Sequence, residues 1–121
     1  KDKIDASGVS YAADSKGVKA WWYIHRNNEA LADYDVYVQI HGYWDASESD
    51  SEARLRLTDE TASVNIVAIS GNTRNGNSSW VKLTDPSHRL FLAFEVTTAS
   101  ATAGATVTLK AAIVYFKYVF V

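Results

Sequence analysis

Two segments of the chain place aromatic and hydrogen-bonding side chains at alternate positions, where an exposed strand usually carries plain charge. Seven residues share this pattern: Trp21, Tyr23 and His25 in the segment 18–26, and Tyr37, Gln39, His41 and Tyr43 in the segment 34–45. A planar ring can stack on the C–H face of a sugar, while amide and imidazole groups exchange hydrogen bonds with its hydroxyls. We therefore predict that these seven residues bind a polysaccharide or an oligosaccharide.

This site depends on how the two segments are arranged. Successive side chains of a strand point to opposite faces, so the mostly apolar even positions would face a core. If both strands lie in one sheet, the odd positions share a single outer surface. Trp22, Trp44 and Trp80 have the phase or setting of core residues and are left out of the site. In the alternative interpretation, a loop, the first strand or another copy of the protein covers the rings.

A polar loop follows the second of these segments and offers hard oxygen ligands. Its acidic residues are Asp45, Glu48, Asp50 and Glu52. Calcium takes six to eight such oxygens, and a bound ion can stiffen a loop of a β-sandwich. The four carboxylates are therefore a predicted site for a structural Ca²⁺, and the alternative is a loop that is only solvated.

Catalysis has no signature in this sequence. A hydrolase needs paired carboxylates in a cleft, or a nucleophile with its base. Glu95 is a single acid on the polar side of a strand, which is typical of solvation. His25 and His41 fall in the same phase, but they lack the local spacing of a metal site and are expected to form hydrogen bonds. We predict a non-catalytic protein that requires no cofactor.

The regular stretches indicate strands throughout. β-Branched and aromatic residues alternate with polar ones, turn residues separate the stretches, and no segment sustains a 3.6-residue period. About eight strands at regular spacing predict an all-β fold, an antiparallel β-sandwich of two sheets and of jelly-roll type. A length of 121 residues fits a single domain, 1–121, with 47% hydrophobic residues to fill its core.

Charge and composition exclude some partners. The net charge is −2 and the basic residues are dispersed, whereas nucleic-acid binding needs a basic patch. No apolar run approaches the roughly 20 residues that span a bilayer, so membrane insertion is not expected. The chain opens on Lys1 and has neither Cys nor Met. We expect an extracellular or secreted protein that has lost a signal or was excised from a longer chain, and the missing sulfur would suit a hot or oxidising exterior.

Several segments together resemble a known family. They are Ala53-Arg54-Leu55-Arg56-Leu57, Trp80-Val81-Lys82-Leu83, 90–96, and Val107-Thr108-Leu109-Lys110-Ala111-Ala112-Ile113. In this order they look like a jelly-roll carbohydrate-binding module of the galactose-binding-like kind, over about half of the chain. The resemblance implies a non-catalytic domain whose calcium would lie away from the sugar. It transfers no binding residue, because these families place their aromatic residues differently.

The last segment favours an alternative function. Residues 111–121 are apolar on both faces apart from Lys117 and the tyrosine hydroxyls. Such a strand must be central in a sheet or covered by another subunit, because an exposed edge invites aggregation. The alternative to sugar binding is therefore a self-assembling subunit of a virion or an extracellular appendage, a homo-oligomer formed through this C-terminal strand.

Overall fold

The computed structural model describes residues 2–4, 8–24 and 32–121. All regular elements in these ranges are strands, and none of the described residues forms a helix. The strands are β1 (Asp2–Ile4), β2 (Val9–Ala12), β3 (Gly17–Ile24), β4 (Tyr34–Ala46), β5 (Glu52–Asp59), β6 (Val64–Gly71), β7 (Arg74–Asn77), β8 (Val81–Lys82), β9 (Leu90–Thr98) and β10 (Thr106–Phe120). Accordingly, these ranges hold no helix of the length and apolarity that crossing a membrane would require.

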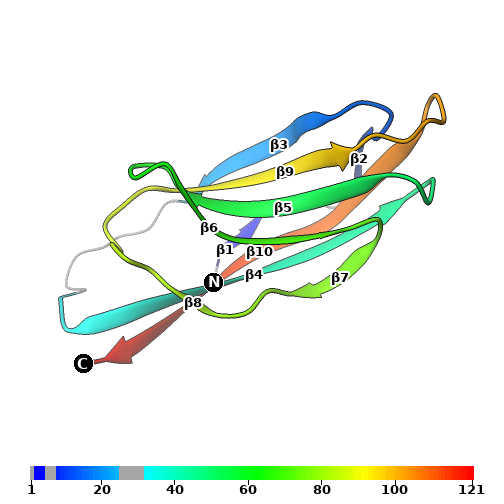
Figure 1. Ribbon diagram of the computed structural model, residues 1–121. Coiled ribbons are helices and arrows are strands. Elements are labelled where there is room, and N and C mark those ends of the chain that lie inside the picture. The colour runs from blue at the N-terminus through cyan, green and yellow to red at the C-terminus, as the bar shows by residue number, and fades with distance from the viewer. Residues whose placement is uncertain (1, 5–7, 25–31) are drawn as a thin grey trace.

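The strands form two antiparallel sheets packed face to face (Figure 1). One, here the β9 sheet, has the order β3-β9-β5-β6. The other, the β10 sheet, has β1 and β2 on one side of β10, then β4, then β7 and β8 on the far side of β4. Most connections cross between the layers, and the orders of the two sheets are those of a jelly roll. The predicted fold class is confirmed, and the ten strands fill eight positions because β1 and β2, and likewise β7 and β8, pair with successive parts of one neighbouring strand.

Strict alternation places the core between the sheets. Leu55 and Leu57 of β5 point inward and are fully buried, while Arg54 and Arg56, each of which precedes one of these leucines, point outward. The same alternation holds in β4 and β9. The largest fully buried side chains are Trp44, Phe94, Ile40, Leu55, Leu57, Leu90, Leu92 and Leu109. Trp44 packs edge-on against Phe94 with ring centres 5.3 Å apart, and its indole N–H donates to the carbonyl of Gly71.

β-Bulges change which residues reach the surface. In β3 the pairing with β9 shifts between Val18 and Ala20, so Val18 lies opposite Glu95 on the outer face and is 46% exposed. The sequence alternation placed Val18 on the core side, and that expectation is wrong because a bulge adds one residue to the strand. In β10 a similar shift lies between Leu109 and Ala111.

Two further expectations of burial are settled by the pairing. The segment that holds Val67 and Ile69 is apolar on both sides, which favours a central or covered strand; β6 is the last strand of its sheet, so it is not central. Trp80 was expected in the core, but it is 39% exposed at the start of the short strand β8. β10 pairs with β4 from Val107 to Phe120, but on its other side β2 and β1 reach only as far as Val114. Its first part is therefore central in the sheet, whereas 115–120 pair with β4 alone among the described strands.

Candidate functional site on the outer face of the β9 sheet

The single aromatic face inferred from the sequence does not exist, because its two strands lie in opposite layers. β3 pairs with β9 in one sheet, and β4 pairs with β10 in the other. Each segment has one apolar face to bury. That face is buried equally well whether the two strands lie in facing sheets or side by side in one sheet. The alternation of odd and even positions is the same whether the two strands share a sheet or lie in facing sheets. The sequence pattern therefore could not distinguish these two arrangements. His25 lies outside the described residues.

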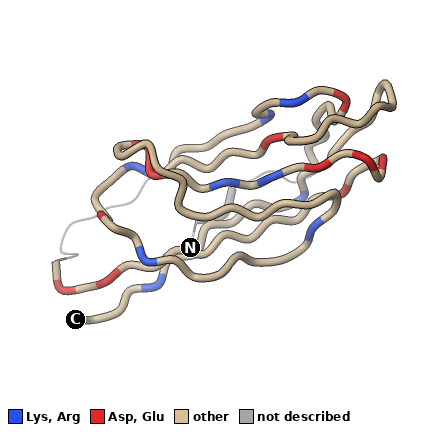
Figure 2. The backbone as a smooth tube through the Cα atoms, in the orientation of Figure 1, with Lys and Arg blue, Asp and Glu red and all other residues tan. Residues whose placement is uncertain are grey.

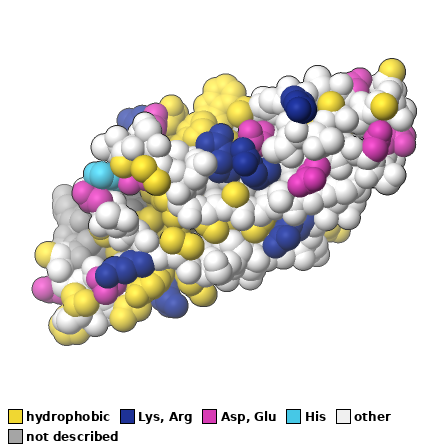
Figure 3. All heavy atoms as spheres, viewed as in Figure 1, with side chains coloured by type: hydrophobic (Ala, Val, Ile, Leu, Met, Phe, Trp, Pro, Cys, Tyr) yellow, Lys and Arg dark blue, Asp and Glu magenta, His cyan; other side chains and the backbone are white. Residues whose placement is uncertain are grey.

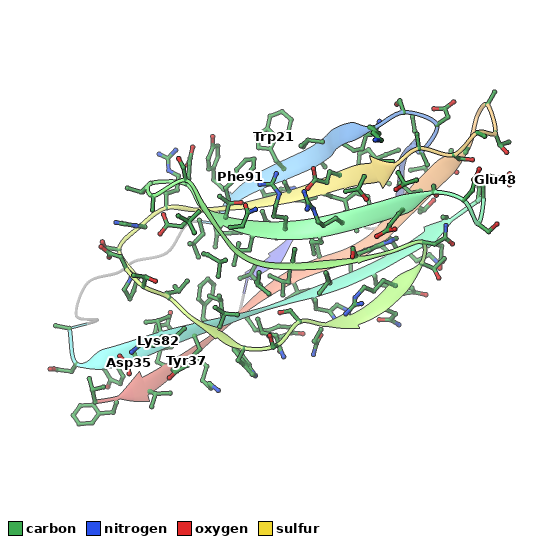
Figure 4. The ribbon with its side chains drawn as sticks, viewed as in Figure 1. Trp21, Asp35, Tyr37, Glu48, Lys82 and Phe91 are labelled. Carbon is green, nitrogen blue, oxygen red and sulfur yellow. The ribbon has the colours of Figure 1, made fainter. Side chains whose placement is uncertain are left out.

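Trp21 and Tyr23 stand on the outer face of the β9 sheet. The side chain of Trp21 is 58% exposed and that of Tyr23 is 40% exposed. Figure 4 shows Trp21 pointing away from the sandwich above β3, with Phe91 of the adjacent strand beside it. The rings of Tyr23 and Phe91 lie 5.5 Å apart at a tilt of 56°, and the guanidinium of Arg89 sits 4.8 Å from the Tyr23 ring centre. An exposed aromatic platform therefore does exist, on one strand and its neighbour.

A charged network adjoins this platform on β5 and β9. One carboxylate oxygen of Glu95 accepts from the Nε atoms of Arg54 at 2.7 Å and Arg56 at 3.1 Å, and Nη2 of Arg54 lies 2.6 Å from it. The Glu95 side chain is only 13% exposed. The expectation that Glu95 is a plainly solvated acid is wrong, because β9 pairs with β5 and brings both arginines beside it. Charge-assisted bonds of this kind fix the side chains in place.

Arg56 extends the network toward the edge strand. Its Nη1 donates to the hydroxyl of Thr58 at 3.1 Å and to the amide oxygen of Asn65 at 3.2 Å. Thr58 in turn donates to the same Asn65 oxygen at 3.1 Å. Hydrogen bonds between side chains therefore fix the positions of the polar groups on β9, β5 and β6.

The register joins platform and network into one surface. Trp21 lies opposite Ala93, and Ala93 lies opposite Arg56 on the next strand. Ala93 is completely buried although it is on the outer face, because the larger side chains around it close over its methyl group. We call this surface the Trp21 face; its members are Trp21, Tyr23, Phe91, Arg54, Arg56 and Glu95. It offers flat rings for stacking beside ordered hydrogen-bonding groups.

The four remaining predicted site residues lie on the outer face of the β10 sheet, where their polar groups contact neighbouring residues. The Gln39 amide donates to the carbonyl of Ser78 at 2.9 Å, and the His41 ring nitrogen Nδ1 is 2.5 Å from the Asn77 amide oxygen. The ammonium of Lys110 lies 5.0 Å from the Tyr43 ring centre. The Gln39 amide nitrogen and the His41 Nδ1 are thus engaged within the chain.

Lys117 joins two aromatic residues of the same face. Its ammonium lies 5.1 Å from the ring centre of Tyr37 and 4.7 Å from that of Trp80. Figure 4 places Tyr37 beside β4 and β8, in the layer opposite Trp21. Tyr37, Tyr43 and Trp80 thus each have a lysine ammonium above the ring, whereas no cation of the described residues lies above Trp21.

The acidic loop uses its carboxylates in separate contacts. Asp45 pairs with the ammonium of Lys110 at 2.5 Å, and Asp50 accepts from the backbone N–H of Ala101 at 3.0 Å. Hydrogen bonds from Ser100 and Ala101 lower the pKa of Asp50 below its ordinary value. Figure 2 shows acidic residues of this loop at one end of the sandwich.

No group of three or more acidic, His or Cys side chains in the described ranges is arranged to hold a metal. Glu48 contributes its backbone carbonyl to the Asn72 amide, and Glu52 is exposed. The calcium site at Asp45, Glu48, Asp50 and Glu52 stays a prediction.

A pocket of about 250 Å³ opens between the layers near the turn from β5 to β6. Its apolar lining comes from Val64, Ile66, Val81 and Leu83, and its polar rim includes Asp59 and His88. The His88 ring lies between two carboxylates, with Nδ1 2.8 Å from Asp59 and Nε2 3.0 Å from Asp85. The hydrogen bond to Asp59, helped by the charges of both acids, raises the pKa of His88. This contact fastens the loop before β9 to the end of β5.

The sequence prediction missed Phe91, Arg54, Arg56 and Glu95 as members of the site. Arg54 and Arg56 are spaced two apart, each before a buried leucine, and Glu95 has the same outward phase in its own strand. These opposite charges were a usable signal that the two strands pair. No match to the chain is found among protein-family models, characterised proteins or solved structures.

Proposed function

We propose that the protein is a non-catalytic carbohydrate-binding domain that acts outside the cell and binds a polysaccharide or an oligosaccharide on the Trp21 face. The observation that carries this proposal is the 58% exposure of Trp21 on a sheet face. Contact with a ligand would remove the apolar surface of this ring from water, which favours binding. A sugar suits the face because Tyr23 extends the platform and the charged groups of β5 and β9 lie beside it.

The test compares one ring on each outer face. Trp21→Ala removes the proposed platform, so affinity for any glycan that the wild-type protein binds should fall roughly 10-fold or more, since a stacked ring contributes about 0.5–1.5 kcal/mol beyond the apolar area that it buries. Tyr37→Ala is the matched control, because Tyr37 lies on the other sheet and contacts Lys117. Binding is measured by glycan array and by titration calorimetry. Thermal unfolding of both variants checks that the fold is kept.

The result that would remove the proposal is equal affinity in Trp21→Ala and the wild-type protein. A loss in Tyr37→Ala alone would move the ligand to the β10 sheet. A wild-type protein that binds no glycan on a broad array would leave the Trp21 face without its proposed ligand.

Self-assembly is the second candidate function, and an apolar end of the β10 sheet favours it. Of the eleven exposed large apolar residues in the described ranges, five lie where β10 ends and β4 begins: Tyr34, Tyr118, Val119, Phe120 and Val121. Phe120 is 72% exposed, and its ring meets Tyr34 at 5.5 Å. Figure 3 shows hydrophobic side chains gathered at this end of the molecule. Apolar patches of this kind mark contact surfaces.

Phe120→Lys tests this candidate. A lysine at the apolar end would oppose burial against another copy, so a wild-type oligomer should dissociate in the variant. Mass is measured by light scattering on a sizing column over a wide concentration range, and Lys82→Gln, a change to an exposed charge, is the control. A wild-type protein that stays monomeric at the highest concentration would rule out assembly through this end.

A further inference from the structure

The net charge of the Trp21 face is positive, whereas that of the whole chain is negative. Three guanidinium groups lie on it or at its margin, those of Arg54, Arg56 and Arg89, against the carboxylates of Glu95 and Glu60. The chain as a whole has a net charge of −2. Figure 2 shows two basic positions in succession along β5, and Figure 3 shows Lys or Arg side chains beside hydrophobic ones on the face in view. The local charge is therefore opposite in sign to that of the protein.

Of the two arginines that are members of the Trp21 face, Arg54 has more donors left for a ligand than Arg56. Its Nε and Nη2 both bind one oxygen of Glu95, and no other described residue takes a bond from it. A guanidinium has five N–H donors, so the outer part of the fork is free. Its side chain is 38% exposed. Arg56 is 20% exposed and bonds Glu95, Thr58 and Asn65, which leaves it to hold the network together.

We propose that the glycan bound on the Trp21 face is acidic, and that Arg54 binds its carboxylate or sulfate group while Trp21 stacks on a sugar ring. The inference rests on the proposed function and adds the ligand class to it. Arginine suits this role because its planar fork matches the oxygens of a carboxylate or sulfate. Glu95 holds the fork in place through its bonds to Nε and Nη2, which leaves the Nη1 side of the guanidinium for a ligand.

The experiment uses the same sugar with and without its charge. Oligogalacturonate and its methyl ester are titrated against the full chain, and a sulfated glycan with its desulfated form makes a second pair. We expect the charged member of one pair to bind at least about 10-fold more tightly, since a hydrogen bond to a charged group contributes roughly 1.5–3 kcal/mol. Which pair responds tells carboxylate from sulfate. The preference should shrink as salt is added.

Three variants assign the effect to a residue. Arg54→Gln should bind both members of the pair alike, and Arg54→Lys should keep part of the preference, because it keeps the charge and loses the fork. Lys82→Gln makes the same change in net charge on the other sheet, where Lys82 pairs with Asp35, and should keep the full preference.

The outcomes separate this inference from the function on which it rests. Equal binding of charged and neutral glycans, still lost in Trp21→Ala, would overturn the acidic ligand and leave sugar binding in place. If Lys82→Gln and Arg54→Gln lose the preference for the charged glycan equally, that preference comes from the overall charge of the protein. This result would overturn the role of Arg54. No binding of any of the four glycans by a wild-type protein that binds other sugars on the array would overturn the acidic ligand alone, and an array without any bound glycan would overturn both.

Discussion

His88 shows how one titratable side chain can fasten two loops together. It bridges Asp59 at the end of β5 and Asp85 in the loop before β9. Beside it, the backbone N–H of Glu60 donates to the carbonyl of Arg89 at 2.9 Å. The imidazolium form makes the better bridge because both partners are carboxylates, so folding favours the protonated ring.

This bridge makes stability depend on pH. The pKa of His88 is raised in the folded protein by its bond to Asp59, so its stabilising effect is complete below the unfolded value of about 6.5 and is lost as pH rises through the folded value. We expect the stability advantage of the wild-type protein over His88→Gln to be larger near pH 6 than near pH 9. Urea unfolding at both pH values measures it. An advantage that grows with pH would contradict the bridge.

At the scale of elements, β4 depends on a missing side chain at Gly42. A Cβ atom there would lie 2.5 Å from Cζ3 of the Trp44 ring and 3.0 Å from the Ile69 methyl group. The ring is fully buried and bonded to Gly71, so it has little room to move. The absence of a side chain is thus what lets the largest core residue fold back over its own strand.

Gly42→Ala should therefore destabilise the fold by about 1–3 kcal/mol through overpacking. Its register partner on β7 supplies the control, because a Cβ atom at Gly76 meets only the tip of Arg74, at 4.0 Å. Gly76→Ala should change the free energy of unfolding by less than about 0.5 kcal/mol. Denaturant titrations of the two variants give both numbers, and equal effects would mean that the Trp44 ring is not fixed where the structure has it.

The alternation of apolar and polar residues predicted most of the fold from the sequence. Which strands pair with one another could not be predicted from it. The strands and their inward residues follow from period two and from apolar runs. Two amphipathic strands look the same whether they share a sheet or face one another, so Tyr37 could not be separated from Trp21. The bulge that turns Val18 outward has no clear residue signature either. Local pattern thus gives each strand's faces, and long-range partners decide which faces meet.

At the scale of the whole molecule, the two outer faces have different characters. The Trp21 face combines exposed rings with ordered arginines, whereas the rings of the β10 sheet contact lysines and its polar groups contact one another. The apolar end near Phe120 is a third surface, which continues β10 and β4 beyond Lys117 and Tyr37 and so lies in the sheet opposite the Trp21 face. Sugar binding on one face and contact between copies at one end are therefore compatible in a single molecule.

The most direct test of the central claim is to map backbone amide shifts by nuclear magnetic resonance while an acidic oligosaccharide is added. The account predicts shifts that saturate together on β3, β5 and β9, with the Trp21 indole N–H among the largest. Shifts confined to β4 and β10 would contradict it, and so would a spectrum that does not change at saturating sugar.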